Sequence, residues 1–299
     1  MNSGGNRFSP LNRSSMAIDF TQQITVRREV LFEGAFYTEG PVCDDQGGIY
    51  FTDLTGGTLW YWRRESGASR CVEGGWPNGQ ARDSMGNWLV CDSKTRQLRR
   101  YDAKGNFTGN VVDGHCAGKP VTTPNDVITD SGGGFYFTDS VRHRGYVFYR
   151  SNTGTERVVA EGLDYPNGLV LSADERHLFV AESYANRLVR IRLDGPGGAA
   201  EWDVFCELPY HASGNPQANL PDGLAIDSAG NVWVAHYGMG ALQVVDKQGK
   251  LLASIPTGIP LTSNVCLLEP DSLIVTGGDA EPGPGRVVKL TLTTNENDE

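Results

Sequence analysis

The sequence lacks the features that nucleic-acid binding and membrane insertion require. Lys and Arg never form a run longer than a pair, and the net charge is −10. This balance argues against nucleic-acid or anionic-membrane partners and suits attraction of a cation. No apolar run approaches membrane-spanning length. The six cysteines include no CxxC pair, and several lie in apolar stretches, so reduced, buried thiols are expected.

Two common hydrolase signatures are also missing. There is no Gly-X-Ser-X-Gly elbow, and the five histidines form no HExxH pair, so serine-hydrolase and zincin chemistries are poorly supported. Residues 1–23 contain no apolar segment of the kind found in secretory signals. We expect them to form a flexible tail, with residues 293–299 as an acidic counterpart, and we expect a cytoplasmic protein.

Glycine is abundant, with 38 residues, which implies many turns and many short strands. Helical periodicity is absent, and the apolar runs are short, β-branched and aromatic. One pattern recurs: an Asp- and Gly-rich turn, a β-prone run, then a small or acidic residue. Its copies end at Asp53, Asp92, Asp139, Glu182, His236 and Gly277, at intervals of 39, 47, 43, 54 and 41 residues. Six copies at this period are typical of four-stranded propeller blades.

The predicted fold is therefore all-β, a six-bladed β-propeller with four antiparallel strands per blade, forming a single domain over residues 24–292. The last copy ends with GRVVKLTL and has no fourth strand. The segment VRREVLFEG near the N-terminus resembles the fourth strands of other copies. It is expected to close the ring in the last blade, which removes an exposed strand edge. A closed ring needs no partner for stability, so a monomer or weak homodimer is expected.

The copies also share a polar position, fourteen residues before the end of the pattern and fifteen in the fourth copy, where the SADERH turn adds a residue. The local sequences are TEGP, WPNG, TPND, YPNG, LPDG and TSNV. We call the residues at this position the ring residues: Glu39, Asn78, Asn125, Asn167, Asp222 and Ser263.

Equivalent positions on the innermost strands of six blades should converge on the channel axis. Two carboxylates and several amides that meet in a partly desolvated place are costly unless a cation compensates. Carboxylate and amide oxygens are the ligands that hard cations prefer. Asn78 and Ser263 are the weaker members and can instead hold a water or a substrate hydroxyl. The alternative is that Pro-Asn-Gly and Pro-Asp-Gly are ordinary turn tripeptides, although this predicts no shared register.

With these motifs in view, residues 24–292 resemble the regucalcin/gluconolactonase/luciferin-regenerating-enzyme family of propellers. The resemblance lies in TEGPVCDDQGGIYFTDL, TPNDVITDSGGGFYFTDS, YPNGLVLSADERHLFVAES and LPDGLAIDSAGNVWVAHY. It implies a metal bound by Glu39, Asn167 and Asp222, with Asn125 joining the metal or contacting substrate. It further implies lactone hydrolysis with Ca²⁺ as the first candidate ion, Zn²⁺, Mn²⁺, Mg²⁺ or Fe²⁺ as alternatives, and Asp222 as acid/base.

The chain departs from this family near the substrate. Regucalcin-type members carry an Arg two residues before the PND-type Asn, where this chain has Thr123. The segment SVRHRGY follows the third copy, so Arg142, His143 and Arg144 are candidates to replace the missing contact. His143 is equally interpretable as a solvated loop residue.

The predicted function is metal-dependent opening of a small lactone, most simply a sugar lactone. The cation would polarise the carbonyl while Asp222 takes a proton from the attacking water. Two alternatives remain: a phosphotriesterase resembling diisopropyl-fluorophosphatase, and a non-catalytic propeller that binds calcium or recognises proteins.

Overall fold

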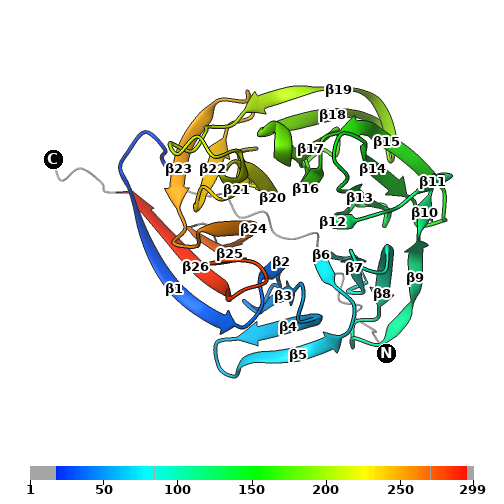
Figure 1. The fold of residues 1–299 in the computed structure, drawn as a ribbon, viewed down its shortest axis with the longest axis horizontal. Coiled ribbons are helices and arrows are strands. Elements are labelled where there is room, and N and C mark those ends of the chain that lie inside the picture. The colour runs from blue at the N-terminus through cyan, green and yellow to red at the C-terminus, as the bar shows by residue number, and fades with distance from the viewer. Residues whose placement is uncertain (1–17, 84, 270, 295–299) are drawn as a thin grey trace, which may run out of the picture.

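The computed structural model describes residues 18–83, 85–269 and 271–294, and these form a ring of six four-stranded sheets around a central axis (Figure 1). Each sheet is one blade, and neighbouring strands within it are antiparallel. The six-bladed propeller expected from the repeat is confirmed. Most of the tail expected over residues 1–23, and most of that over residues 293–299, lies outside the described residues.

The strands of each blade follow one another from the channel outward. Blades 1 to 3 consist of β2 (Thr38–Cys43) to β5 (Gly67–Glu73), β6 (Pro77–Arg82) to β9 (Phe107–Asp113), and β12 (Pro124–Thr129) to β15 (Glu156–Leu163). Blades 4 and 5 consist of β16 (Pro166–Leu171) to β19 (Gly198–Glu207) and β20 (Leu220–Ile226) to β23 (Leu251–Pro256). The strands between them are β3 (Ile49–Asp53), β4 (Thr58–Arg63), β7 (Trp88–Asp92), β8 (Gln97–Tyr101), β13 (Phe135–Asp139), β14 (Gly145–Arg150), β17 (His177–Glu182), β18 (Arg187–Gly195), β21 (Val232–Tyr237) and β22 (Ala241–Val245).

The sixth blade joins the two ends of the chain. It contains β24 (Leu261–Glu269), β25 (Ser272–Gly278), β26 (Gly285–Thr294) and, as its outermost strand, β1 (Ile24–Gly34). The β1–β26 ladder runs antiparallel from the Ile24–Thr294 pair to the Gly34–Gly285 pair, and the two strands lie side by side in Figure 1. The prediction that the N-terminal segment closes the ring is confirmed.

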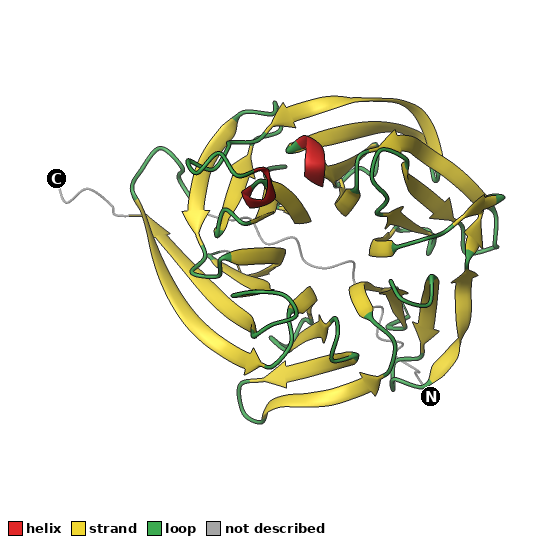
Figure 2. Cartoon of the chain, in the orientation of Figure 1, coloured by secondary structure: helices red, strands yellow, loops and turns green. Residues whose placement is uncertain are grey.

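Little else in the described chain departs from the blades. A two-stranded hairpin, β10 (His115–Cys116) with β11 (Lys119–Pro120), lies between blades 2 and 3. Two single-turn 3-10 helices occur, η1 (Ser183–Ala185) and η2 (Pro216–Ala218), as Figure 2 shows in red. In the part of the chain that the structure describes, no helix has the length and apolar character needed to cross a membrane.

The core is divided among the interfaces between neighbouring blades. In β7, Leu89 and Cys91 join a buried cluster shared with blade 3, whereas Trp88 and Val90 join a cluster shared with blade 1. Alternate residues of a strand point to opposite faces, and both faces of the sheet are covered here. This explains why the strands read as continuous apolar runs without polar alternation.

The chain just before β1 also contacts the core. Ile18 and Phe20 pack against the cluster between blades 5 and 6, and the Phe20 ring lies 5.7 Å from the Trp233 ring, centroid to centroid. These two residues belong to the segment that the sequence analysis assigned to the N-terminal tail.

Candidate functional site

The inner strand of every blade has the same register against its neighbour. In each blade, the residue before the ring residue pairs with the last residue of the repeated pattern. The six pairs are Thr38 with Asp53, Pro77 with Asp92, Pro124 with Asp139, Pro166 with Glu182, Pro221 with His236 and Thr262 with Gly277. The fourth blade keeps this register because its turn is longer: the Ser172 N–H bonds the His177 carbonyl, whereas the Asp130 N–H bonds the Gly134 carbonyl.

Each inner strand carries a β-bulge at this level. Between Pro166 and Leu169, for example, Asn167 and Gly168 together oppose one residue of β17. Equivalent register shifts occur in β2, β6, β12, β20 and β24. A bulge bends the strand and re-aims its side chains. The ring residues therefore lie within bulged strands rather than in turns, and the turn-tripeptide alternative does not describe them.

Glycine follows four of the ring residues because the inner strands approach one another closely. A Cβ at Gly168 would lie 2.3 Å from the Asp222 carbonyl oxygen, and one at Gly79 would lie 2.2 Å from Asp126 Oδ1. Neither glycine has a positive φ, so space rather than backbone conformation requires it. In blades 3 and 6 the corresponding residues are Asp126 and Asn264, and both side chains are buried.

Two ring carboxylates, Glu39 and Asp222, are buried on the inner strands of blades 1 and 5. Burial raises the pKa of Glu39 to about 8, and the charges of Asp126 and Glu281 act in the same direction. Burial also raises the pKa of Asp222 well above its usual value, with the charges of Glu39, Asp126 and Glu281 adding to the effect. The carboxylates are thus close enough to penalise one another's ionisation, as expected when like charges share a desolvated site.

Two ring amides have their orientation fixed by serines. Ser93 and Ser183 each donate their hydroxyl proton to a carbonyl of the next blade, Pro124 O at 2.8 Å and Pro221 O at 2.7 Å. Each hydroxyl oxygen can then only accept. It accepts from the Nδ2 group of Asn78 at 3.4 Å or of Asn167 at 3.3 Å. A hydrogen-bond network of this kind settles which end of an amide is the nitrogen.

The opposite ends of these amides have no partner. Oδ1 of Asn78 and Oδ1 of Asn167 are both buried and accept no hydrogen bond from any described residue. A buried carbonyl oxygen without a donor costs free energy unless a ligand, an ion or a water completes it. Two unpartnered amide oxygens beside two carboxylates form a donor set that suits a hard cation. No group of three His, Cys, Asp or Glu side chains in the described chain has the spacing of a metal site.

The remaining two ring residues differ from one another. Asn125 is buried. Ser263 is fully buried, and its hydroxyl lies 2.9 Å from the Thr38 carbonyl oxygen and 2.9 Å from the Thr276 hydroxyl. It therefore connects blade 6 to blade 1. The next residue, Asn264, reaches the ring instead, with its Nδ2 group 3.5 Å from Glu39 Oε2.

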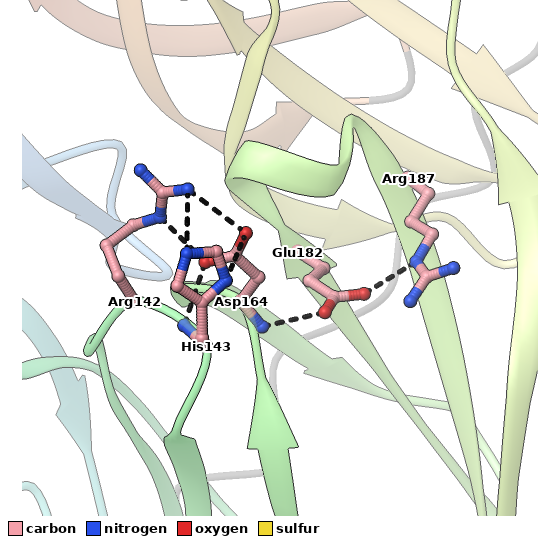
Figure 3. A network of polar contacts seen from close by, with 5 residues as sticks. All are labelled: Arg142, His143, Asp164, Glu182 and Arg187. Carbon is pink, nitrogen blue, oxygen red and sulfur yellow. Dashed lines mark hydrogen bonds and ion pairs between the residues drawn. The ribbon is translucent and has the colours of Figure 1, made fainter.

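The predicted substrate contacts lie on the connections beside the ring. Thr123 precedes β12, and Asp139 Oδ1 accepts a hydrogen bond from its N–H group. Arg142 and His143 follow β13 and both contact the carboxylate of Asp164, as Figure 3 shows. Arg142 donates from Nε to Asp164 Oδ1 at 2.7 Å and from Nη2 to Oδ2 at 3.3 Å.

Arg142, His143 and Arg144 are all exposed, but Arg142 is also held in place. The Arg142 guanidinium is held by Asp164 and also lies 3.7 Å above the Tyr184 ring. Asp164 is fixed in turn by Glu182, which accepts its backbone N–H at 2.7 Å and pairs with Arg187 at 2.6 Å (Figure 3). The His143 side chain is 74% exposed.

Sequence reasoning assigned no site role to several residues beside the carboxylates, among them Tyr37, Tyr165, Tyr237 and Glu281. Burial raises the pKa of Tyr165 to about 12, with the Asp222 charge as the next cause. Burial likewise raises the pKa of Tyr37, and the charges of Glu39 and Asp222 follow. Tyr37 and Tyr165 each lie two residues before a ring residue, and Tyr237 directly follows the last residue of the fifth pattern, His236, so the register could have identified them. Glu281 occupies no repeated position and carried no such signal.

A pocket of about 430 Å³ lies elsewhere, between the end of β1 and the outer strands of blade 1. Its lining includes Phe32, Phe36, Trp60 and Arg70 but none of the ring residues. The candidate site is therefore defined by its polar groups rather than by this pocket.

Residues 37–278 match a protein family described as SMP-30/Gluconolactonase/LRE-like region. The lactonase drp35 of Staphylococcus aureus is 35% identical over 176 residues, which cover 55% of this chain and 53% of that protein, so the match spans about half the length of that relative. The gluconolactonase of Zymomonas mobilis is 27% identical over 90% of this chain and 83% of its own length. The structure of a gluconolactonase from Xanthomonas campestris superposes with a TM-score of 0.77 at 26% identity and covers 94% of each chain.

Proposed function

The chain belongs to the SMP-30/gluconolactonase/LRE-like family, and from this premise we propose that it is a metal-dependent hydrolase that opens a small lactone. A sugar lactone is the first candidate substrate, because the Zymomonas and Xanthomonas relatives are named gluconolactonases. One observation carries the proposal: two buried carboxylates and two buried, unpartnered amide oxygens occupy equivalent positions of one ring.

We assign the divalent cation to Glu39, Asn167 and Asp222, with Asn125 as a further ligand or a substrate contact. Ca²⁺ is the first candidate because carboxylate and amide oxygens suit it, and Zn²⁺, Mn²⁺, Mg²⁺ and Fe²⁺ are alternatives. A bound cation would supply Lewis-acid polarisation of an ester carbonyl. Like Asn167, Asn78 has an oriented side-chain oxygen without a partner. We assign Asn78 to the cation's periphery, where it holds a water or a substrate hydroxyl.

The chain's own groups then account for the proton transfers. The Asp222 carboxylate accepts a proton from the attacking water as the water oxygen bonds the carbonyl carbon. When the ring C–O bond breaks, the same proton passes to the departing alkoxide oxygen, and the product is a hydroxy acid. Ser263, whose hydroxyl is engaged between blades 6 and 1, is assigned to holding the ring together rather than to substrate.

The substrate contacts are assigned to the rim. His143 is accessible and can hydrogen-bond a lactone hydroxyl, whereas Arg142 acts by fixing Asp164. Thr123 offers a shorter side chain than the Arg found in regucalcin-type relatives, which leaves room for the substrate. A monomer or weak homodimer and a cytoplasmic location remain predictions from the sequence.

The test is hydrolysis of a sugar-lactone panel by metal-stripped protein, with single ions added back. We expect no turnover without metal and recovery with one or more divalent ions. Asp222→Ala should abolish turnover, with unchanged far-UV circular dichroism, because it removes both a ligand and the proton acceptor. A fluorophosphate ester in the same panel separates the phosphotriesterase alternative. Near-normal lactone hydrolysis by Asp222→Ala would refute the assignment.

A further inference from the structure

Glu281 lies on the connection between β25 and β26, at the end of the blades where the inner strands begin. Backbone hydrogen bonds hold this connection in place: the Tyr37 N–H donates to the Pro282 carbonyl at 2.8 Å, and the Asp279 N–H donates to the Pro284 carbonyl at 3.0 Å. The Glu281 side chain is exposed, yet the Tyr237 hydroxyl donates to Glu281 Oε1 at 3.0 Å. The carboxylate is thus fixed beside the ring by residues of blades 1 and 5.

The charge of Glu281 acts on the ring carboxylates Glu39 and Asp222. Tyr237 adjoins Tyr37, with ring centroids 6.3 Å apart, and Tyr37 lies two residues before Glu39. The Glu281 charge contributes to the raised pKa values of Glu39, Asp222, Tyr37 and Tyr165, although burial is the largest cause for each. These groups come from blades 1, 4 and 5, so the carboxylate lies at the end of the ring where their inner strands begin.

The group that holds the Glu281 carboxylate, the Tyr237 hydroxyl, is neutral. The carboxylate forms no ion pair with any described Lys, Arg or His side chain. Arg142, at the rim, is bound through two hydrogen bonds to Asp164, and Lys94 lies above the Trp76 ring at 5.2 Å. An anionic ligand that enters the mouth therefore meets an uncompensated negative charge before it reaches the ring.

We infer that Glu281, held by the Tyr237 hydroxyl, is a specificity-determining residue that favours neutral lactones over anionic ones and weakens binding of the carboxylate product. The inference rests on the proposed lactonase function and names the class of substrate for the same site. A like charge at an entrance lowers the affinity of an anionic ligand and leaves a neutral one less affected. The effect should shrink as salt rises, because the Glu281 side chain is exposed to solvent.

The experiment compares D-glucono-1,5-lactone with its 6-phosphate on wild type, Glu281→Gln and Tyr237→Phe. The ratio of kcat/KM for the phosphorylated over the neutral lactone should rise about tenfold in Glu281→Gln at low salt. Tyr237→Phe should raise it less, because the carboxylate remains but is no longer fixed. Glu65→Gln is the matched control: it removes the same charge from the exposed β4–β5 turn, at the opposite end of the blade. An unchanged ratio in Glu281→Gln, or an equal rise in Glu65→Gln, overturns the inference.

Calorimetry separates this inference from the proposed function. D-Gluconate should bind Glu281→Gln about tenfold more tightly than wild type, and Ca²⁺ affinity should change little. A loss of Ca²⁺ affinity of tenfold or more would make Glu281 a ligand and overturn the specificity role. If wild type hydrolyses neither lactone, the proposed function fails, and the gluconate titration still decides whether Glu281 excludes anions.

Discussion

At the residue scale, Asn78 and Asn167 show how a serine hydroxyl can orient a buried amide. An unrestrained amide presents either its oxygen or its nitrogen, and the nitrogen end would repel a cation. Ser93 and Ser183 remove this freedom because their protons are already donated to Pro124 and Pro221. Partners that orient a ligand in this way contribute to metal affinity without touching the ion.

Ser183→Ala should therefore weaken Ca²⁺ binding by about tenfold or more, because Asn167 loses the acceptor that orients its amide. Ser93→Ala makes the same change at Asn78, which we assign to a water or a substrate hydroxyl, and it should affect Ca²⁺ less. Isothermal titration of both variants measures the difference. Wild-type affinity in Ser183→Ala would remove Asn167 from the ligand set, and an equal loss in Ser93→Ala would add Asn78 to it.

At the scale of the strand, a β-bulge in each blade, with a glycine after the ring residue in four of them, lets the six inner strands meet around a narrow axis. In blades 2 to 5 the bulge places the ring residue and its successor opposite one partner residue, so the inner strand can present both. Glycine is needed where the successor faces the backbone of the next blade. At Gly168 the nearest atoms to an added Cβ are the backbone carbonyl oxygen of Asp222 at 2.3 Å and the Cα of Gly223 at 2.5 Å.

Gly168→Ala should lower stability by about 1–3 kcal/mol, because backbone atoms cannot move aside for the methyl group. It should also weaken Ca²⁺ binding, since the atoms displaced belong to the strand that carries Asp222. Gly132→Ala is the control: its φ is not positive, and the nearest atom to the added Cβ is 3.4 Å away. Thermal unfolding and metal titration report both effects. Equal melting temperatures for Gly168→Ala and Gly132→Ala would argue against close strand approach as the reason for glycine at position 168.

At the scale of the whole molecule, the ring depends on one ladder between distant parts of the sequence. β1 supplies the outer strand of blade 6, and Leu31 and Phe32 pack against the cluster shared by blades 1 and 6. Each blade interface buries side chains from two sheets, so no blade has a complete core alone. Loss of β1 exposes the edge of β26 and opens one side of that cluster.

A chain that begins at residue 35 should therefore aggregate, or melt without a single cooperative transition. A chain that begins at residue 18 keeps β1, Ile18 and Phe20 and should melt close to the full-length protein. Size-exclusion chromatography and calorimetry distinguish the two. A chain starting at residue 35 that remains monomeric, with unchanged unfolding, would show that closure by β1 is dispensable.

The sequence by itself determined the blade count, the closing strand and the register of the six inner strands. These follow from local rules: antiparallel strands joined by short turns keep a fixed offset, so a side chain's distance from the next strand end can be counted along the chain. The same counting placed Glu39, Asn167 and Asp222 at equivalent positions, and the family resemblance then proposed them as metal ligands. It even accounted for the longer turn of blade 4, where Ser172 bonds His177.

Only the tertiary structure decided how those positions are used. Spacing cannot show that the Ser263 hydroxyl is hydrogen-bonded between blades 6 and 1 while the Asn264 side chain reaches Glu39. The reason is that a bulge shifts which side chain faces the central axis. Nor can spacing show that Tyr237 contacts Glu281, since this contact joins the end of β21 in blade 5 to the β25–β26 connection of blade 6. Such groups meet only when the ring closes, and the burial and charge that define the site arise from that closure.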